Sequence, residues 1–180
     1  MKVTPTRIPD VLIIEPDVFT DERGFFFESW HKRRFIEHGL DWEFVQDNHS
    51  RSVRHTLRGL HYQLRRPQGK LVRVTAGEIF DVAVDLRRRS PTFLHWVGEI
   101  LSAKNTRMMW IPPGFAHGFY VVSEFADCVY KCTEHYSPCD ERSLRWDDPE
   151  IGIEWPCTAP PILSSKDRAA PGLAGAEFFD

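Results

Sequence analysis

Two histidines stand beside glycines in apolar, strand-like runs and are the first candidates for chemistry. His61 lies in the run RGLHYQ, and His117 lies in the run PPGFAHGF. A β-strand alternates its side chains between two faces, so Gly59, His61 and Gln63 are expected to share one face. A polar, ring-bearing face inside a β fold indicates a pocket. A histidine in such a pocket can take up and release protons near neutral pH.

Neither histidine has the companions that a catalytic metal needs. Such sites commonly use three protein ligands, often in a His-x-His or His-x-x-Glu cadence. The residue two positions after His61 is Gln63, and His117 is followed by Gly118 and Phe119. The spacing therefore predicts no metal ligands here and favours proton transfer by His61.

Other polar residues on neighbouring predicted strands leave two interpretations open. Lys70 begins an apolar strand and either extends its amine to solvent or points it at an oxyanion. Asp81 on a central strand needs a partner, and His117 or Lys70 would serve. For Tyr130 the pattern alone favours amphipathic packing. Ser164 belongs either to a solvated loop or to a helix N-cap.

These side chains require a β scaffold, and the hydrophobic pattern supplies one. The most convincing helix is predicted over residues 31–38, closed by Gly39. A hairpin is expected around residues 76–77, and the last forty residues are expected to wrap the body with one or two helical turns. Short strands between turn signals indicate a sandwich or barrel. The predicted strands are residues 11–14, 25–30, 44–48, 56–63, 70–74, 79–85, 95–102, 107–111, 119–122 and 128–134.

Length and charge narrow the class of protein. The chain has 180 residues, which suits one domain over residues 1–180, and its formal net charge of -3 gives no nucleic-acid footprint. No apolar run approaches the ~20 residues of a membrane span, and no signal segment opens the chain, so a cytoplasmic location is expected. Because Lys and Arg are frequent locally, an anionic small molecule remains a candidate ligand. The four cysteines are expected to be buried free thiols: Cys128, Cys132, Cys139 and Cys157.

Taken in order, the motifs resemble those of the dTDP-4-dehydrorhamnose 3,5-epimerase family. They are DERGFF, QDN, LRGLHYQ, QGK, FDVAVD, PPGFAHGF and LSSKD, spread over about residues 8–173. The resemblance implies an all-β, cupin-type jelly-roll β-barrel with a few short helices. It further implies a homodimer that exchanges an N-terminal hairpin, with no metal and no organic cofactor.

The same resemblance implies a reaction. A dTDP-4-keto-6-deoxyhexose substrate, dTDP-4-dehydro-6-deoxy-D-glucose, would be inverted at C3 and C5 to dTDP-4-dehydro-L-rhamnose, in dTDP-L-rhamnose biosynthesis. A proton α to a ketone is removable only if a base lies beside it and the resulting enolate is stabilised. Inversion also needs an acid on the opposite face of the ring.

The resemblance assigns roles to the candidates. His61 is the base and Asp167 its carboxylate partner, while Tyr130 is the acid on the far face and Lys70 stabilises charge on O4. Tyr136 corresponds to a ring stacked on the thymine. The substrate-binding positions are Arg23, Glu28, Gln46, Asp47, Asn48, Arg58, Lys70, Asp81, His117, Tyr136, Glu141 and Lys166. The first two would reach the partner subunit's pocket.

One departure and two alternatives accompany the resemblance. His55 stands where the family usually has glycine or another small residue, outside the proposed catalytic set. The first alternative is an epimerase acting on one carbon of a dTDP-4-keto-6-deoxysugar in another deoxysugar pathway. The second is a non-catalytic sugar-nucleotide-binding cupin, which would need no acid–base set.

Overall fold

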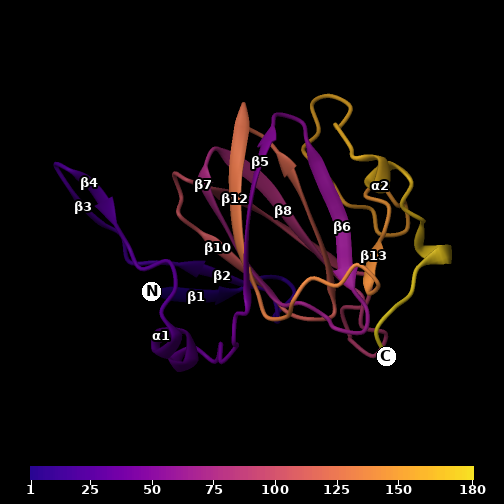
Figure 1. Cartoon of the computed structure of the whole chain (residues 1–180), viewed down its shortest axis with the longest axis horizontal. Helices are drawn as coiled ribbons and strands as arrows, with labels where there is room; N and C mark the ends of the chain where they lie inside the picture. The colour runs from indigo at the N-terminus through magenta and orange to yellow at the C-terminus, as the bar shows by residue number, and fades with distance from the viewer.

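Two antiparallel β-sheets face each other and form the body of the protein (Figure 1). The computed structural model describes residues 1–180. The six-stranded sheet has the order β1 (Lys2–Pro5), β2 (Leu12–Glu15), β10 (Met108–Ile111), β7 (Lys70–Ala76), β12 (Phe125–Cys132) and β5 (Gln46–Val53). The five-stranded sheet has the order β13 (Glu141–Ser143), β6 (Leu57–Gln63), β11 (Phe115–Val121), β8 (Glu78–Asp85) and β9 (Trp96–Ser102). The all-β expectation is confirmed, but the sheets stay separate as a jelly-roll sandwich and do not close into a barrel.

The remaining elements are short. The strands β3 (Phe19–Asp21) and β4 (Gly24–Phe26) form a hairpin that projects from the body (Figure 1). Helix α1 (Lys32–Glu37) lies beside the six-stranded sheet, and α2 (Ser165–Arg168) and the 3-10 turn η1 (Leu173–Gly175) lie in the C-terminal segment. None of these helices has the length and apolar character that crossing a bilayer needs.

The predicted helix over residues 31–38 is confirmed. The chain leaves α1 at Gly39, whose φ of 81° is easily reached only by glycine. The Gly39 amide donates to the carbonyl of Ile36 at 2.9 Å, and the Leu40 amide donates to the carbonyl of Phe35 at 2.9 Å. These bonds satisfy the last carbonyls of the helix.

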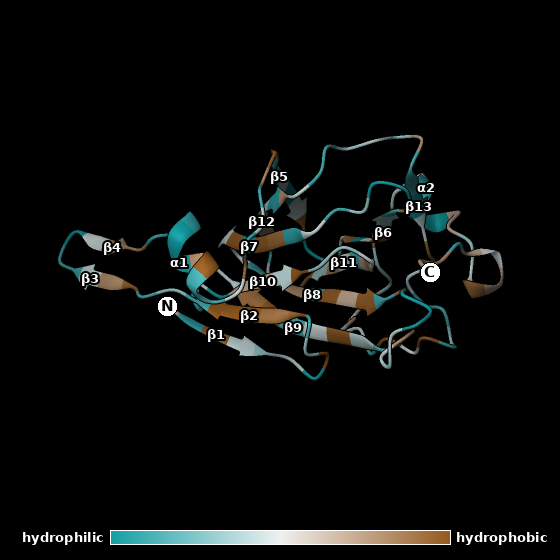
Figure 2. Cartoon of the chain, turned by 90° about the horizontal axis from the view of Figure 1, so that it is seen from below, coloured by the Kyte–Doolittle hydropathy of each residue, from teal (hydrophilic) through white to brown (hydrophobic).

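Three apolar clusters hold the layers together, and the hydrophobic strands run through the middle of the molecule (Figure 2). The largest lies between the sheets and joins Val72 and Met109 of one sheet to Ile79 and Phe119 of the other. Because strands such as β8 are covered on both faces, they have continuous apolar runs instead of strict alternation.

The other two clusters cover the outer faces of the sheets. On the five-stranded sheet, Leu60 and Val82 pack with Leu173 of the C-terminal segment. On the six-stranded sheet, Phe35 of α1 packs with Trp110 of β10. The expectation that the last forty residues wrap the body with short helical turns is therefore confirmed.

The prediction of a hairpin around residues 76–77 is wrong. β7 already pairs with β10 and β12, so both of its edges are occupied, and β8 pairs with β11 and β9 in the other sheet. Gly77 alone separates β7 from β8, with φ 76°, and a Cβ there would lie 1.9 Å from the Phe125 carbonyl oxygen. Only glycine fits this passage from one sheet to the other.

Other boundaries differ from the pattern. The strand expected over residues 25–30 ends at Phe26, and the one expected over 128–134 runs from Phe125 to Cys132. β1, β3 and β13 were not predicted, because short edge strands carry little periodic signal. All four cysteines are free, but only Cys128 and Cys132 are buried; the other two are exposed or half-buried.

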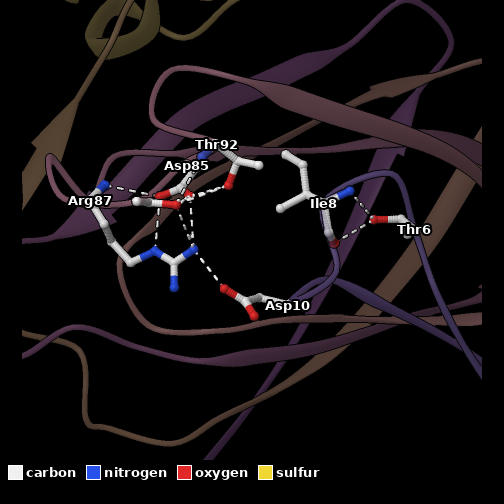
Figure 3. Close-up of polar contacts among 7 residues, drawn as sticks. Thr6, Ile8, Asp10, Asp85, Arg87 and Thr92 are labelled. Atoms are coloured by element: carbon white, nitrogen blue, oxygen red, sulfur yellow. Dashed lines mark hydrogen bonds and ion pairs between the residues drawn. The ribbon is translucent and has the colours of Figure 1, made fainter.

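A buried carboxylate closes the corner after β8 (Figure 3). Asp85 is fully buried and accepts hydrogen bonds from the Arg87 guanidinium, from Ser90 Oγ at 2.5 Å and from Thr92 Oγ1 at 2.7 Å. Arg87 also pairs with Asp10 at 2.7 Å. Burial raises the pKa of Asp85, but the hydrogen bonds from Arg87, Ser90 and Thr92 outweigh it, so the pKa lies below its ordinary value.

Replacing Asp85 by asparagine should lower the free energy of unfolding by about 3 kcal/mol. The Arg87 guanidinium loses its buried charged partner and keeps only the exposed Asp10, and the Ser90 and Thr92 hydroxyls lose a charged acceptor. A depressed carboxyl pKa stabilises the fold above the unfolded-state value, about 3.9, and this contribution is lost as pH falls through the folded-state pKa. Urea unfolding of both proteins from pH 7 to pH 3 measures it. The difference should be full above about pH 4 and shrink below; a constant difference would contradict this assignment.

Candidate active site

A cavity of about 240 Å³ opens between the two sheets. Its walls come from β6 and β13 of one sheet and from β5, β7 and β12 of the other. The lining residues are mostly polar: Gln46, Asn48, His61, Tyr62, Gln63, Gln68, Lys70, Tyr130, Tyr136 and Glu141. A polar cavity inside an otherwise apolar sandwich is the candidate active site.

His61 is placed on the cavity wall by a close approach of two strands. It pairs in register with His117 of β11. Gly59 has φ 138°, and a Cβ there would lie 2.5 Å from the Cα of Gly118, so the strands need glycine at this crossing. The register of the two strands shifts at this point. The prediction that His61 faces a pocket is confirmed.

Asp167 holds the imidazole of His61 from the C-terminal segment. His61 Nε2 and Asp167 Oδ1 are 2.5 Å apart, although 106 residues separate them in the chain. Asp167 is buried, and the Ser164 hydroxyl donates to its Oδ2 at 2.8 Å. The Asp167 amide donates to Ser164 Oγ at 3.1 Å, so Ser164 caps α2. Of the two readings of Ser164, the N-cap is correct.

The charge state of Asp167 suits a partner for a protonated imidazole. Burial raises the pKa of this carboxyl, but the hydrogen bond and charge of His61, with the Ser164 hydroxyl, outweigh burial and hold the pKa below its ordinary value. An ionised carboxylate on one nitrogen fixes the ring orientation and stabilises the charge that the ring gains when it takes a proton.

The opposite wall carries a phenol and an amine. Tyr130 of β12 and Lys70 of β7 both line the cavity, with the Lys70 amine 6.0 Å from the centre of the Tyr130 ring. Burial raises the pKa of Tyr130 to about 12, so the phenol keeps its proton at neutral pH. Burial lowers the pKa of Lys70, opposed by Cys132, Asp81 and Glu141 nearby.

The Lys70 amine makes no hydrogen bond within the chain, and it reaches the cavity instead of bulk solvent. Of the two interpretations of this residue, extension of the amine to bulk solvent is wrong, because Lys70 lines the cavity. An unpaired ammonium in a partly dry cavity is costly to hold, and it attracts negative charge more strongly than one in water.

A second His–Asp pair lies behind the first. His117 Nε2 and Asp81 Oδ1 are 2.7 Å apart, and both side chains are buried. Burial lowers the pKa of His117, opposed by the Asp81 carboxylate. Asp81 Oδ2 is buried without a hydrogen-bond partner. The expectation that Asp81 finds a partner in His117 is confirmed.

Polar side chains at the outer end of the cavity are joined to one another. The Tyr136 amide donates to Gln46 Oε1 at 2.8 Å, and Gln46 Nε2 donates to Asn48 Oδ1 at 3.0 Å. The Tyr136 hydroxyl donates to Glu141 Oε2 at 3.1 Å, and the Lys166 amine donates to Glu141 Oε1 at 2.7 Å. Half-exposed Tyr136 thus presents its ring beside hydrogen-bonding groups.

Seven expected substrate-binding residues are not among those that line the cavity. Asp81 and His117 lie behind it, and Lys166 bonds Glu141 at its outer end. The other four are Arg58, Asp47, Arg23 and Glu28. Arg58 is exposed and donates to Ser52 Oγ at 2.9 Å. Asp47 points to the other face of β5, because strand neighbours alternate, and pairs with Lys131 at 3.0 Å. Arg23 of the hairpin pairs with Asp21, and Glu28, two residues after β4, pairs with Arg34 of α1.

Three lining residues were not among the expected site residues. Gln68 donates to the Glu134 carbonyl at 2.7 Å, and the QGK motif that contains it was its only signal. Gln63 bonds the backbone of Arg66 and Ser137 and so braces the loops around the cavity. Tyr62 lines the cavity despite its opposite parity to His61. No three His, Cys, Asp or Glu side chains gather in a geometry that could hold a metal ion.

Comparison with known proteins identifies the family of the chain. The family model described as dTDP-4-dehydrorhamnose 3,5-epimerase matches residues 5–175. The dTDP-4-dehydrorhamnose 3,5-epimerase of Pseudomonas aeruginosa is 60% identical over 180 residues, covering 99% of each chain. That of Salmonella typhimurium is 59% identical, covering 96% of each chain.

A solved structure shares the fold as well. The dTDP-6-deoxy-D-glucose-3,5-epimerase of Legionella pneumophila, in complex with dTDP-4-keto-L-rhamnose, superposes with a TM-score of 0.95 at 53% identity. The match covers 98% of this chain and 94% of that one. The chain described here therefore belongs to the dTDP-4-dehydrorhamnose 3,5-epimerase family.

Proposed function

We propose that the protein epimerises C3 and C5 of dTDP-4-dehydro-6-deoxy-D-glucose and so forms dTDP-4-dehydro-L-rhamnose, the step that serves dTDP-L-rhamnose biosynthesis. The observation that carries the proposal is the placement of a base and an acid on opposite walls of one cavity. His61 stands on the five-stranded sheet and Tyr130 on the six-stranded sheet. A sugar ring between them presents one face to each.

Each inversion breaks one C–H bond and makes another on the opposite face. His61 takes the proton α to the C4 ketone, while Asp167 stabilises the resulting imidazolium. The electron pair of the broken C–H bond forms a double bond to C4, the carbonyl π pair moves to O4, and the Lys70 ammonium stabilises the enolate. Tyr130 then protonates the carbon from the other face. Both side chains regain their resting protonation through solvent, so a solvent proton enters the product.

The outer end of the cavity supports a nucleotide. Tyr136 offers a flat ring for stacking on a base, with Gln46 and Glu141 beside it to hydrogen bond. Lys166 stands at the same end, where a cation binds phosphate oxygens through charge-assisted hydrogen bonds. We assign this end to the dTDP moiety and the His61 end to the sugar.

Turnover of dTDP-4-dehydro-6-deoxy-D-glucose in deuterated solvent tests the function. Deuterium should enter the product at both C3 and C5, because each inversion replaces a substrate proton with one from solvent. Proton NMR of the purified product locates the label. Label at one carbon would show a single-carbon epimerase, and label at neither carbon would indicate a binding protein.

We propose further that the protein works as a homodimer that exchanges the β3–β4 hairpin. Phe19, Phe25 and Phe26 on this projecting hairpin are 63%, 67% and 66% exposed (Figure 1). Three phenylalanines on one small hairpin form an apolar surface that a monomer rarely leaves uncovered. Docked on a second subunit, the hairpin would bring Arg23 and Glu28 to the partner's cavity.

Changing Phe25 and Phe26 together to aspartate should produce a monomer of low activity, because the charges oppose burial of the hairpin. Light scattering coupled to gel filtration gives the mass. The control is Ile100→Asp, which places a charge at an exposed apolar residue of β9. A wild-type monomer, or a double variant that still dimerises, would contradict the exchange.

A further inference from the structure

The turn between β5 and β6 contains a strained residue with an unusual side-chain contact. His55 has φ 66°, a left-handed conformation that residues other than glycine adopt at some cost. Its Nδ1 lies 2.5 Å from the hydroxyl oxygen of Tyr120 on β11. Tyr120 is 1% exposed, so this contact satisfies a phenol hydroxyl that is otherwise surrounded by the fold.

The same turn anchors the segment that carries Asp167. The Ile162 amide donates to the His55 carbonyl at 2.8 Å, and the Leu57 amide donates to the Ile162 carbonyl at 3.0 Å. Asp167 follows Ile162 by five residues, and His61 follows Leu57 by four. The turn is therefore bonded close in sequence to both members of the catalytic pair.

Within the C-terminal segment the Lys166 amine bonds Glu141, but the next backbone hydrogen bond to the body lies beyond Asp167. There the Arg145 amide donates to the Pro171 carbonyl at 2.8 Å, and the Leu173 amide donates to Asp148 Oδ2 at 3.0 Å. The segment between Ile162 and Pro171 thus spans two fixed points. Movement of Ile162 therefore shifts the Asp167 carboxylate relative to the imidazole of His61.

Backbone bonds already tie the turn to β11, which makes a test of the ring alone possible. The His55 amide donates to the Val121 carbonyl at 3.1 Å, and the Val121 amide donates to the Thr56 carbonyl at 3.0 Å. These bonds form whatever side chain stands at position 55. The imidazole of His55 adds a side-chain hydrogen bond that sets the distance between the turn and β11.

We propose that His55 is a positioning residue: by bonding the Tyr120 hydroxyl, it holds the β5–β6 turn, and through Ile162 it sets the distance between Asp167 and His61. The inference deepens the proposed function and rests on it for its kinetic readout. His55 does not line the cavity, so it acts only through the catalytic pair.

Two variants remove the link without opening the fold. His55→Gly keeps the left-handed backbone and deletes the ring, and Tyr120→Phe deletes only the hydroxyl. Each should lower kcat by about threefold to thirtyfold, because small misplacements of a catalytic group are strongly felt. KM should change by less than about twofold, since the nucleotide end is untouched. The matched control is Arg54→Ala, an exposed neighbour in the same turn.

The double variant His55→Gly/Tyr120→Phe should be no slower than the worse single variant, because both remove one shared contact. Additive losses, an unchanged kcat, or equal changes in kcat and KM would overturn the proposal. A thermal midpoint that falls without a kcat change would assign His55 to stability alone.

A second readout does not depend on turnover. The proton between His61 and Asp167 should give a downfield 1H NMR resonance, identified by its loss in Asp167→Asn. In His55→Gly and Tyr120→Phe this resonance should shift, while Arg54→Ala leaves it in place. A shift without any wild-type epimerisation would retain the positioning role and reject the proposed function; an unshifted resonance would reject the positioning role.

Discussion

Replacing His61 by asparagine should reduce kcat by about 10²–10⁴-fold, the usual contribution of a positioned general base. Asparagine is polar and fits in the space of the ring, but its amide ends near the position of Nδ1, short of the Nε2 that bonds Asp167, and it cannot accept a proton from carbon. Deuterium entry at C3 and C5 should fall with kcat, because both exchanges begin at the same base. Single-turnover NMR with dTDP-4-dehydro-6-deoxy-D-glucose measures both quantities.

The loss must be separated from a folding defect. Binding of dTDP, followed by calorimetry, should stay within a few-fold of wild type, since Tyr136 and Glu141 are unchanged. His49→Asn provides the matched control, because His49 lies on the exposed face of β5. A His61→Asn protein that keeps more than a tenth of wild-type kcat would show that another group removes the proton.

Replacing Lys70 by methionine should reduce kcat by about 10²–10³-fold, the effect of losing one group that stabilises an oxyanion. Methionine keeps the length and apolar stem of lysine but removes the charge that faces O4. KM should change little, since the negative charge develops only as the C–H bond breaks. Steady-state kinetics with the same substrate gives both constants.

The same variant should be at least as stable as wild type. Lys70 has no hydrogen-bond partner in the chain, and burial lowers the pKa of its amine, so the charged form is held at a cost to folding. Methionine removes that cost, and the thermal midpoint should stay equal or rise. A large drop in the midpoint would assign Lys70 to structure; unchanged kcat would remove it from the reaction.

Local pattern was enough for most strands of the two sheets and for the face on which His61 lies. Period-two alternation and the neighbouring glycines identified this strand, and the helix stop at Gly39 was equally clear. These features depend on residues close in sequence, whose spacing alone carries the signal.

Features that depend on distant residues were not accessible to the pattern. Nothing local shows that Gly77 leads into a different sheet, because that follows from β10 and β12 occupying both edges of β7. The contact of His61 with Asp167 likewise spans the whole fold, and only the family resemblance suggested it. Residues of the hairpin, such as Arg23, need a second subunit before their role can be tested.

The apolar layer between the sheets has an effect beyond stability. Tyr130 packs against this layer, and His61 stands on the other sheet, so the thickness of the layer sets the gap between acid and base. Val72 and Phe119 act in this sense as spacers. Smaller or larger core side chains would change the distance between the two walls that hold the sugar ring. A redesign of this core for stability would therefore also change substrate selectivity.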